Sequence, residues 1–140
     1  HSEVADVLSG LGNAYYSLGD YAKMRDLQER ALAIKERAYG PDHTSVATTL
    51  NGLGNAYGNL GDPAKKRDML ERALAIKERA YGPDHVELGI PLWNLALTHG
   101  RLGDNKKKRE ILERALAINE NFYGPDHSET ADCREALAEI

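Results

Sequence analysis

Apolar residues recur every three or four positions along the chain and predict a series of amphipathic helices. Between positions 46 and 60 the apolar or small residues fall on one face of a helix with 3.6 residues per turn. Gly61 then provides a left-handed stop, Asp62 an N-cap, and Pro63 a first helical position. A second helix is expected to run to about Tyr81. Its residues expected to be mostly inward are Met69, Leu70, Ala73, Leu74, Ile76, Ala80 and Tyr81.

This pair of helices repeats at a fixed interval of 42 residues. The pentapeptide Tyr-Gly-Pro-Asp-His occurs at Tyr39–His43, Tyr81–His85 and Tyr123–His127. A constant period of this size is typical of a solenoid, in which each repeat buries its apolar face against its neighbours. We therefore expect a single all-α solenoid domain over residues 1–140, with repeats at about 3–44, 45–86 and 87–128 and a terminal helix over 129–140.

The repeated pentapeptide is interpreted as a turn and a cap. Gly82 ends a helix and Pro83 prevents its continuation, while Asp84 with Glu87 forms a capping-box-like pair for the next helix. Asp126 and Glu129 repeat the arrangement. The expected role of the motif is structural.

Composition narrows the function classes. The net charge of −4 gives no general attraction to nucleic acid or to an anionic membrane. Cys133 is the single cysteine, which favours a reducing compartment, and we expect a cytoplasmic protein. No apolar stretch approaches ~18 residues, and the start of the chain has no signal segment, so no membrane span is expected.

The first residues continue the repeat register. His1 aligns with His43, the last residue of a pentapeptide, and no initiator methionine precedes it. Two interpretations are open: a fragment of a longer array, or the remnant of an expression tag that falls in register by chance.

Leu53-Gly54, followed by Tyr57 and then by Ala73 in the second helix, resembles the tetratricopeptide repeat. The 42-residue period and the pentapeptide turn resemble the long variant found in kinesin light chains and in bacterial arrays. The resemblance implies a right-handed α-solenoid of antiparallel helix pairs. In such a solenoid the first helices line a concave groove for a peptide or a partner protein.

Some positions depart from the family pattern. The small residue usual early in the second helix is replaced by Met24, Lys66 and Lys108, which puts the packing of that turn in doubt. The large residue expected four positions later is Gln28, Leu70 and Leu112. Pro91 removes a helical donor from the third repeat and is tolerable only in the first turn of a helix.

The groove face of each first helix follows from its helical wheel. It changes from polar in repeat one, through asparagine-rich in repeat two, to apolar with one cation in repeat three. The side chains predicted to contact a partner are Asn13, Asn55, Asn59, Ile90, Trp93, Leu97 and Arg101. Asn13 and Asn55 can hydrogen-bond a peptide backbone, or they are solvated polar residues on a wet face. With Arg101 as the only groove cation, a carboxylate clamp is not expected.

Ile90, Trp93 and Leu97 place apolar side chains on a face that is polar in the other repeats. Two interpretations are open: Trp93 anchors a partner as a hot spot, or the terminal helix or a second molecule covers the three residues. The terminal helix carries Arg134 where Leu50 and Leu92 stand. This charge suits a capping helix with one polar face, and a truncated ordinary repeat is the alternative.

Other chemistry is not expected. His43, His85 and His127 lie too far apart in a stacked array to share a metal. For the loop aspartates two interpretations are open: they hold Ca²⁺ between adjacent repeats, or they serve only as helix caps. The runs Lys65–Arg67 and Lys106–Arg109 lie near acidic residues and lack interleaved aromatics, which indicates a solvated face. No catalytic constellation, cofactor motif or activating neighbour of Cys133 is found in the sequence.

The sequence therefore predicts a non-enzymatic scaffold that binds a protein or peptide segment in the groove, without cofactor, metal, nucleic acid or membrane. The alternatives are a structural array that associates with itself head to tail, and the sensor portion of a larger signalling protein.

Overall fold

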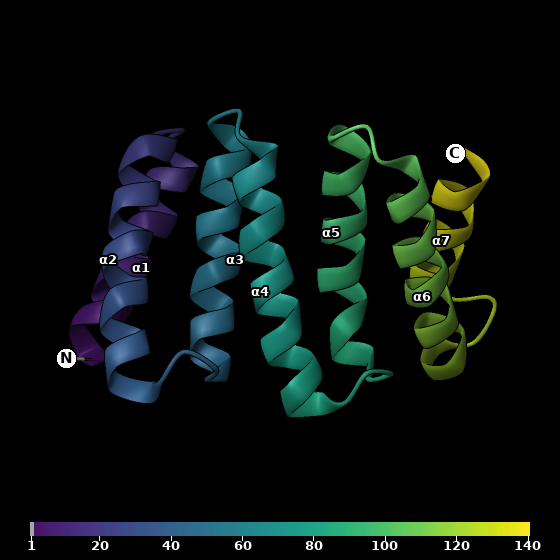
Figure 1. Ribbon diagram of the computed structural model, residues 1–140, viewed down its shortest axis with the longest axis horizontal. Helices are drawn as coiled ribbons and strands as arrows, with labels where there is room; N and C mark the ends of the chain where they lie inside the picture. Colours follow the sequence, from purple (N-terminus) through teal and green to yellow (C-terminus); the bar gives the residue numbers. More distant parts are fainter. Residues whose placement is uncertain (1) are drawn as a thin grey trace. The chain divides into compact units, whose positions relative to one another are not determined.

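The computed structural model describes residues 2–140, and every regular element in that range is helical (Figure 1). This confirms the all-α prediction and its seven helices; His1, with its register argument, lies outside the described residues. The elements are α1 (Ser2–Ser17), α2 (Tyr21–Tyr39), α3 (Thr44–Asn59), α4 (Pro63–Tyr81), the 3₁₀ helix η1 (Val86–Leu88), α5 (Gly89–Arg101), α6 (Asn105–Tyr123) and α7 (Ser128–Ala138).

The chain divides into two compact units, one ending at Ile76 and one spanning Lys77–Ile140. In the first unit α2 packs against both α1 and α3. Ala31 of α2 is buried with Ala5 and Leu8 of α1, and the half-buried Leu27 and Ile34 complete that cluster. A second cluster joins α3 to α4 and consists of Val46, Ala47, Leu50, Ala73 and Ile76, with Leu32 and Met69 packed against it.

In the second unit α6 packs against both α5 and α7. Leu92 of α5, Leu112 and Ala115 of α6, and Thr130 and Cys133 of α7 are almost completely buried. Because α6 packs against α5 on one side and α7 on the other, α6 fixes the positions of both helices. This arrangement sets the geometry of the candidate site.

The turn between α3 and α4 confirms the predicted stop and start. Gly61 has a φ of 86°, a conformation that costs little only for glycine. Asp62 Oδ1 accepts a hydrogen bond of 3.1 Å from the backbone N–H of Lys65, and Pro63 is the first residue of α4. The far end of α4 differs from the prediction: Ala80 and Tyr81 are exposed, since they lie in its last turn beyond the buried cluster.

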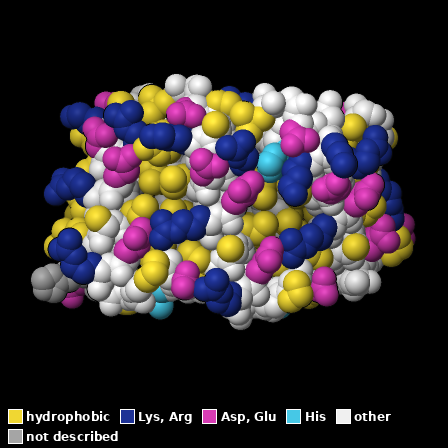
Figure 2. Space-filling view, viewed as in Figure 1, with side chains coloured by type: hydrophobic (Ala, Val, Ile, Leu, Met, Phe, Trp, Pro, Cys, Tyr) yellow, Lys and Arg dark blue, Asp and Glu magenta, His cyan; other side chains and the backbone are white. Residues whose placement is uncertain are grey.

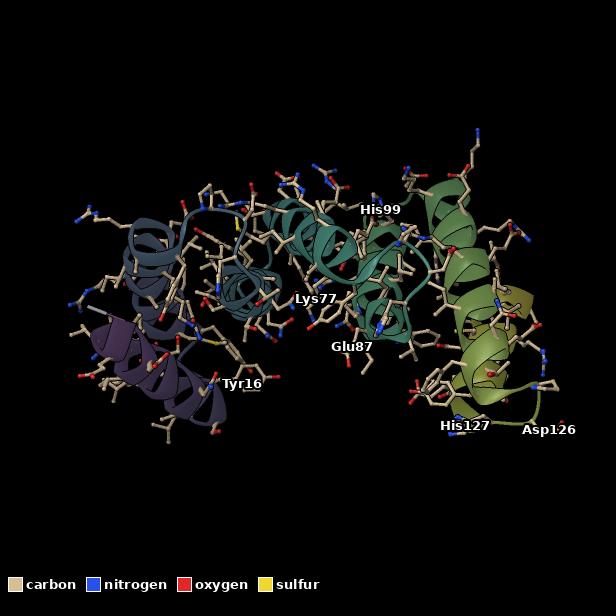
Figure 3. All side chains as sticks on the ribbon, turned by 90° about the horizontal axis from the view of Figure 1, so that it is seen from below. Tyr16, Lys77, Glu87, His99, Asp126 and His127 are labelled. Carbon is tan, nitrogen blue, oxygen red and sulfur yellow. The ribbon has the colours of Figure 1, made fainter. Side chains whose placement is uncertain are left out.

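The cap in the pentapeptide turn is a histidine, and the predicted pairing of Asp84 with Glu87 is wrong. His85 Nδ1 accepts a hydrogen bond of 3.0 Å from the backbone N–H of Glu87, and its ring stacks on Tyr81 with centroids 5.0 Å apart. His43 and His127 repeat this arrangement, and Figure 3 shows Asp126 and His127 in the turn before α7. The imidazole reaches the helix N-terminus because the tyrosine four residues earlier holds it there.

Pro91 changes how the first helix of the third repeat begins. The chain forms the 3₁₀ turn η1 and only then the α-helix α5, in which Pro91 is the third residue. The expected first-turn position is confirmed, since a proline there removes no intrahelical hydrogen bond that α5 needs.

The long side chains at the usual small position are accommodated by glycines opposite them. A side-chain carbon added at Gly58 would lie 2.6 Å from Cδ of Lys66, and one added at Gly100 would lie 2.8 Å from Cδ of Lys108. The missing side chain of each glycine therefore makes room for the lysine, which resolves the expected packing difficulty in repeats two and three.

Arg134 lies on the exposed side of α7. Its Nη1 donates a hydrogen bond of 2.8 Å to the carbonyl of Pro125, and its Nη2 is 3.8 Å from Glu120 Oε1. Thr130 and Cys133 are the buried residues of this helix.

Candidate functional site in the groove between α5 and α7

The predicted contact residues divide between the two units. In the first unit Asn13 and Asn59 are exposed and Asn55 is half-buried. Asn59 Nδ2 donates a hydrogen bond of 2.9 Å to the carbonyl of Asn55, so one N–H of this amide is used within its own helix. Ile90, Trp93, Leu97 and Arg101 lie on α5 in the second unit, where Arg101 is exposed in the last turn.

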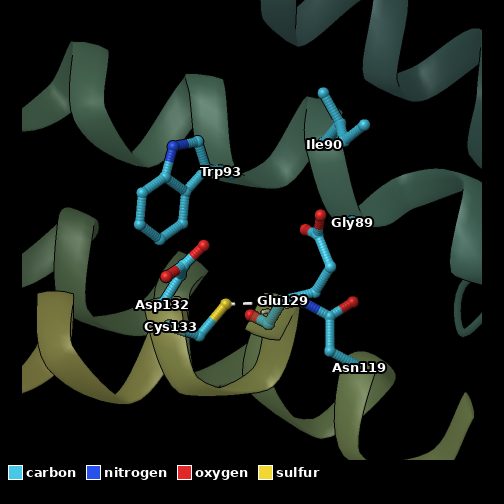
Figure 4. A pocket seen from close by; sticks show the side chains of 7 residues that line it. All are labelled: Gly89, Ile90, Trp93, Asn119, Glu129, Asp132 and Cys133. Carbon is cyan, nitrogen blue, oxygen red and sulfur yellow. Dashed lines mark hydrogen bonds between the residues drawn. The ribbon is translucent and has the colours of Figure 1, made fainter. Parts of the chain in front are cut away.

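A row of three pockets runs between α5 and α7. The first, of about 140 Å³, lies between Ile90 and Trp93 on α5 and Glu129, Asp132 and Cys133 on α7 (Figure 4). A second, of about 130 Å³, continues toward η1, and a third, of about 260 Å³, continues past Leu97. We call this row the α5–α7 groove.

One wall of the groove is apolar. Ile90 is 68 % exposed and Leu97 39 % exposed, while Trp93 is half-buried between them. The terminal helix therefore lies beside these side chains without burying Ile90 or Leu97. Large apolar side chains exposed in a row along a concave site are unusual on a protein surface unless something binds them.

The opposite wall is acidic. It consists of Glu129, Asp132, Glu135 and Glu139 of α7, and Glu87 adds a further carboxylate at the η1 end. Lys108 is the one basic side chain among the residues that line the three pockets. Within residues 2–140, none of the five carboxylates forms an ion pair.

The floor of the groove is formed by Asn119 and Cys133. Asn119 is 4 % exposed, and its Nδ2 donates to the carbonyl of Glu129 at 3.4 Å and to Cys133 Sγ at 3.5 Å. Its Oδ1 lies 3.0 Å from the point where a side-chain carbon at Gly89 would stand. Gly89 replaces the alanine found at Ala5 and Ala47 in the other repeats, and so leaves space for the amide.

Cys133 is a buried free thiol. Burial raises its pKa above the ordinary value, a shift that the hydrogen bond from Asn119 partly opposes. Because the thiolate is the nucleophilic form, this residue has none of the character of a catalytic cysteine.

Neither metal-site geometry nor a membrane-spanning helix is found in the part of the chain that the structure describes. No group of three or more His, Cys, Asp or Glu side chains there is placed to hold an ion. None of the helices formed by residues 2–140 combines the length and apolar character needed to cross a membrane.

The basic runs lie among acidic side chains. Arg67 contacts Asp68 at 3.1 Å, and Lys65 Nζ lies 4.9 Å from the centroid of the Tyr57 ring. Figure 2 shows basic and acidic side chains interleaved over the visible face of each unit. The Lys65–Arg67 run is thus part of a mixed, solvated surface.

Family models for the tetratricopeptide repeat match residues 3–78 and residues 94–129. The chain belongs to the tetratricopeptide repeat family. Tetratricopeptide repeats form scaffolds for protein–protein interaction and are in general not enzymes. No curated protein sequence matches the chain.

Several solved structures share this fold. The putative kinesin light chain repeats of Podosopora anserina superpose with a TM-score of 0.85 at 22 % identity, covering 99 % of this chain and 66 % of that one. BtubC (BKLC) from P. vanneervenii superposes with a TM-score of 0.87 at 22 % identity, covering 96 % of this chain and 54 % of that one. The chain thus spans two thirds or less of these relatives. The first TPR of Spaghetti (RPAP3), bound to the HSP90 peptide SRMEEVD, superposes with a TM-score of 0.67 at 20 % identity, covering 99 % of this chain and 96 % of that one.

The acidic wall and the floor are the parts of the site that the sequence did not predict. The sequence pattern assigns no binding role to the carboxylates of α7 or to Asn119. Alignment of the repeats does contain a signal for Asn119. Asn119 stands where the preceding repeat has Lys77, and Gly89, which makes space for it, stands where that repeat has Ala47.

Proposed function

We propose that this tetratricopeptide repeat protein binds a partner segment in the α5–α7 groove, with Trp93 as the anchor. The observation that carries the proposal is the apolar wall itself. Ile90, Trp93 and Leu97 occupy the positions of Thr48, Asn51 and Asn55 in the preceding repeat. Apolar side chains that replace polar ones at the mouth of a groove are typical of an interaction surface.

Trp93 is suited to this role by its position between the pockets. It lines both the pocket of about 140 Å³ and the pocket of about 260 Å³, so its indole forms part of two adjoining hollows. A cavity of roughly 150 Å³ holds a benzene ring, and each hollow therefore has room for one apolar side chain of a partner. Truncation of such an anchor costs about 2 kcal/mol, or about thirtyfold in affinity.

The remaining predicted contacts keep supporting roles in this proposal. Asn13, Asn55 and Asn59 stay proposed contacts of the first unit by itself, where their side-chain amides offer donors and acceptors to a peptide backbone. Arg101, at the end of α5, contacts the partner beyond Leu97. We also propose that the chain is of the long, 42-residue variant of the repeat, because its period and pentapeptide turns recur without interruption.

Selection of peptides from a displayed library tests the proposal. The selection is run on the intact chain and counter-selected on Trp93→Ala. Phe122→Ala is the matched control, since Phe122 is 64 % exposed on α6 in the same unit and lines none of the three pockets.

We expect motifs that are enriched on the wild type and on Phe122→Ala and are lost on Trp93→Ala. Enrichment that survives the loss of Trp93, or the absence of any enrichment, contradicts the proposal. Circular dichroism of both variants checks that their helices remain intact.

A specific observation on α1 favours self-association as a second candidate. Val4, Val7 and Leu11 are 50 %, 62 % and 47 % exposed and form one row along the helix. Their equivalents in α3 are buried, in a helix that packs against α2. A second copy of the chain that covers this row would give concentration-dependent sedimentation, and Val7→Asp would abolish it. A monomer at all concentrations contradicts this candidate.

A further inference from the structure

The two walls of the α5–α7 groove differ in chemistry, and this difference specifies a ligand. We infer that the groove selects an extended segment in which apolar and basic side chains alternate. The inference rests on the proposed function and adds the class of partner to it.

The charge of the groove favours a basic ligand. Five carboxylates and one ammonium line the three pockets, and the carboxylates are unpaired in the described residues. A partner that brings acidic side chains between these walls would add repulsion, whereas one that brings lysine or arginine would neutralise it. Charge complementarity of this kind excludes wrong partners more effectively than it adds affinity.

The arrangement of the two walls favours a ligand whose side chains alternate in chemistry. Apolar side chains project from α5 and carboxylates from α7, and both helices are held by α6. In an extended segment, successive side chains point to opposite sides. A segment lying along the groove therefore directs every second side chain to Trp93 and Leu97 and the others to Asp132 and Glu135.

The spacing of the wall residues agrees with this geometry. Trp93 and Leu97 are four residues apart on a helix, or about 6 Å along its axis. Alternate side chains of an extended chain are about 6.6 Å apart. Two apolar side chains of the segment thus fit the pockets on either side of the indole, with a cation between them facing α7.

Asn119 offers a hydrogen-bond acceptor to the backbone of a bound segment. It is 4 % exposed and lines the two pockets nearest η1, and Nδ2 is the donor in both hydrogen bonds of its side-chain amide. Its Oδ1 has no hydrogen-bond donor among residues 2–140. This oxygen is not one of the fully buried polar atoms that lack a partner, so it stays free to accept a hydrogen bond from a backbone N–H of the bound segment.

Defined peptides test the inference on the intact chain. Trp93 is the only tryptophan, so its fluorescence reports directly on the groove. The first probe is an acetylated and amidated peptide in which leucine and lysine alternate, flanked by glycine and serine. The second has glutamate in place of lysine. The third has the composition of the first with the leucines and lysines in separate blocks.

Matched variants separate the groove charges from the total charge. Asp132→Asn with Glu135→Gln removes two carboxylates from the groove. Glu110→Gln with Glu113→Gln removes two exposed carboxylates from α6 that line none of the pockets. Both double variants change the net charge equally and keep side-chain size, so folding is matched; their circular dichroism confirms it.

We expect the alternating lysine peptide to bind at least about tenfold more tightly than the glutamate peptide or the block peptide. The groove variant should weaken its binding about tenfold, the α6 variant less than about twofold, and raised salt should reduce it. Equal binding of the lysine and glutamate peptides, or equal effects of the two variants, would overturn the selectivity for cations. Equal binding of the block peptide would overturn the alternation.

The failures of the two proposals are distinguishable. Selected peptides that need Trp93 and carry acidic residues would leave the groove as a binding site and refute this inference. Absence of any ligand that depends on Trp93 would refute the proposed function and this inference with it.

Discussion

Replacement of Gln28 by leucine is expected to stabilise the first unit by about 1 kcal/mol. Gln28 lies on α2 and is 3 % exposed, and its Oε1 has no hydrogen-bond partner among the described residues. The equivalent positions in the next two repeats are Leu70 and Leu112, both buried. Position 28 therefore holds a polar side chain where the fold elsewhere uses an apolar one.

The size of the effect follows from two opposing contributions. An unsatisfied buried oxygen costs roughly 1–3 kcal/mol, and leucine removes that cost. The fit is tight, however, because side-chain carbons at Gly12 and Gly52 would lie only 3.0 and 3.1 Å from Nε2 of Gln28. Seating a branched side chain there costs up to about 1.5 kcal/mol. The net gain is about 1 kcal/mol.

Guanidinium unfolding followed by circular dichroism measures the change, and hydrogen exchange of α1, α2 and α3 places it in the first unit. The reverse substitution Leu112→Gln is the control and should destabilise the second unit by about 1–3 kcal/mol. A loss of stability in Gln28→Leu would refute the reasoning, because it would mean that the amide contributes more than its unpaired oxygen costs.

Three further predictions concern other contacts. The hydrogen bond to Glu29 raises the pKa of Tyr57 to about 12. The stability that this bond provides should therefore be complete below about pH 10, the ordinary tyrosine pKa, and should be lost as the pH rises toward 12. Urea unfolding across that range should show this loss of stability in the wild type and not in Tyr57→Phe. Cys133 should react with a thiol reagent at least about a hundredfold more slowly in the folded than in the unfolded protein, because burial raises its pKa; equal rates would contradict this. Gly58→Ala should change stability little, since displacement of Lys66 offsets the gain in helix propensity, whereas Gly58→Ala with Lys66→Ala should stabilise the protein by about 1 kcal/mol in thermal unfolding.

The helices were predictable because their signals are local. The stop at Gly61, the cap at Asp62 and the start at Pro63 all appear in the structure as the sequence indicates. Each depends on the backbone preference of one residue and on contacts within one turn. The family assignment followed from the same regularity.

The histidine caps were not predicted, because they depend on two interactions at once. The imidazole accepts a backbone hydrogen bond only when a tyrosine ring four residues earlier holds it in place, as Tyr81 holds His85. Histidine is not among the usual capping residues, and the aspartate beside it offered a more familiar explanation. The fixed Tyr-to-His spacing in all three turns was the signal available.

The candidate site was half predictable. The apolar wall follows from the helical wheel of α5 alone, since Ile90, Trp93 and Leu97 share one face. The acidic wall depends on how α7 packs on α6, which brings Asp132 opposite Trp93. Tertiary packing of this kind leaves no trace in the periodicity of either helix.

One measurement tests the central claim most directly. A ¹H–¹⁵N spectrum of the chain contains a single indole N–H signal, from Trp93, and this signal is followed as a selected peptide is added. We predict that it shifts together with the side-chain amide of Asn119 and the backbone amides of α5 and α7. If the indole signal stays in place at saturation, or the shifts gather on α1 and α3 instead, the α5–α7 groove is not the binding site.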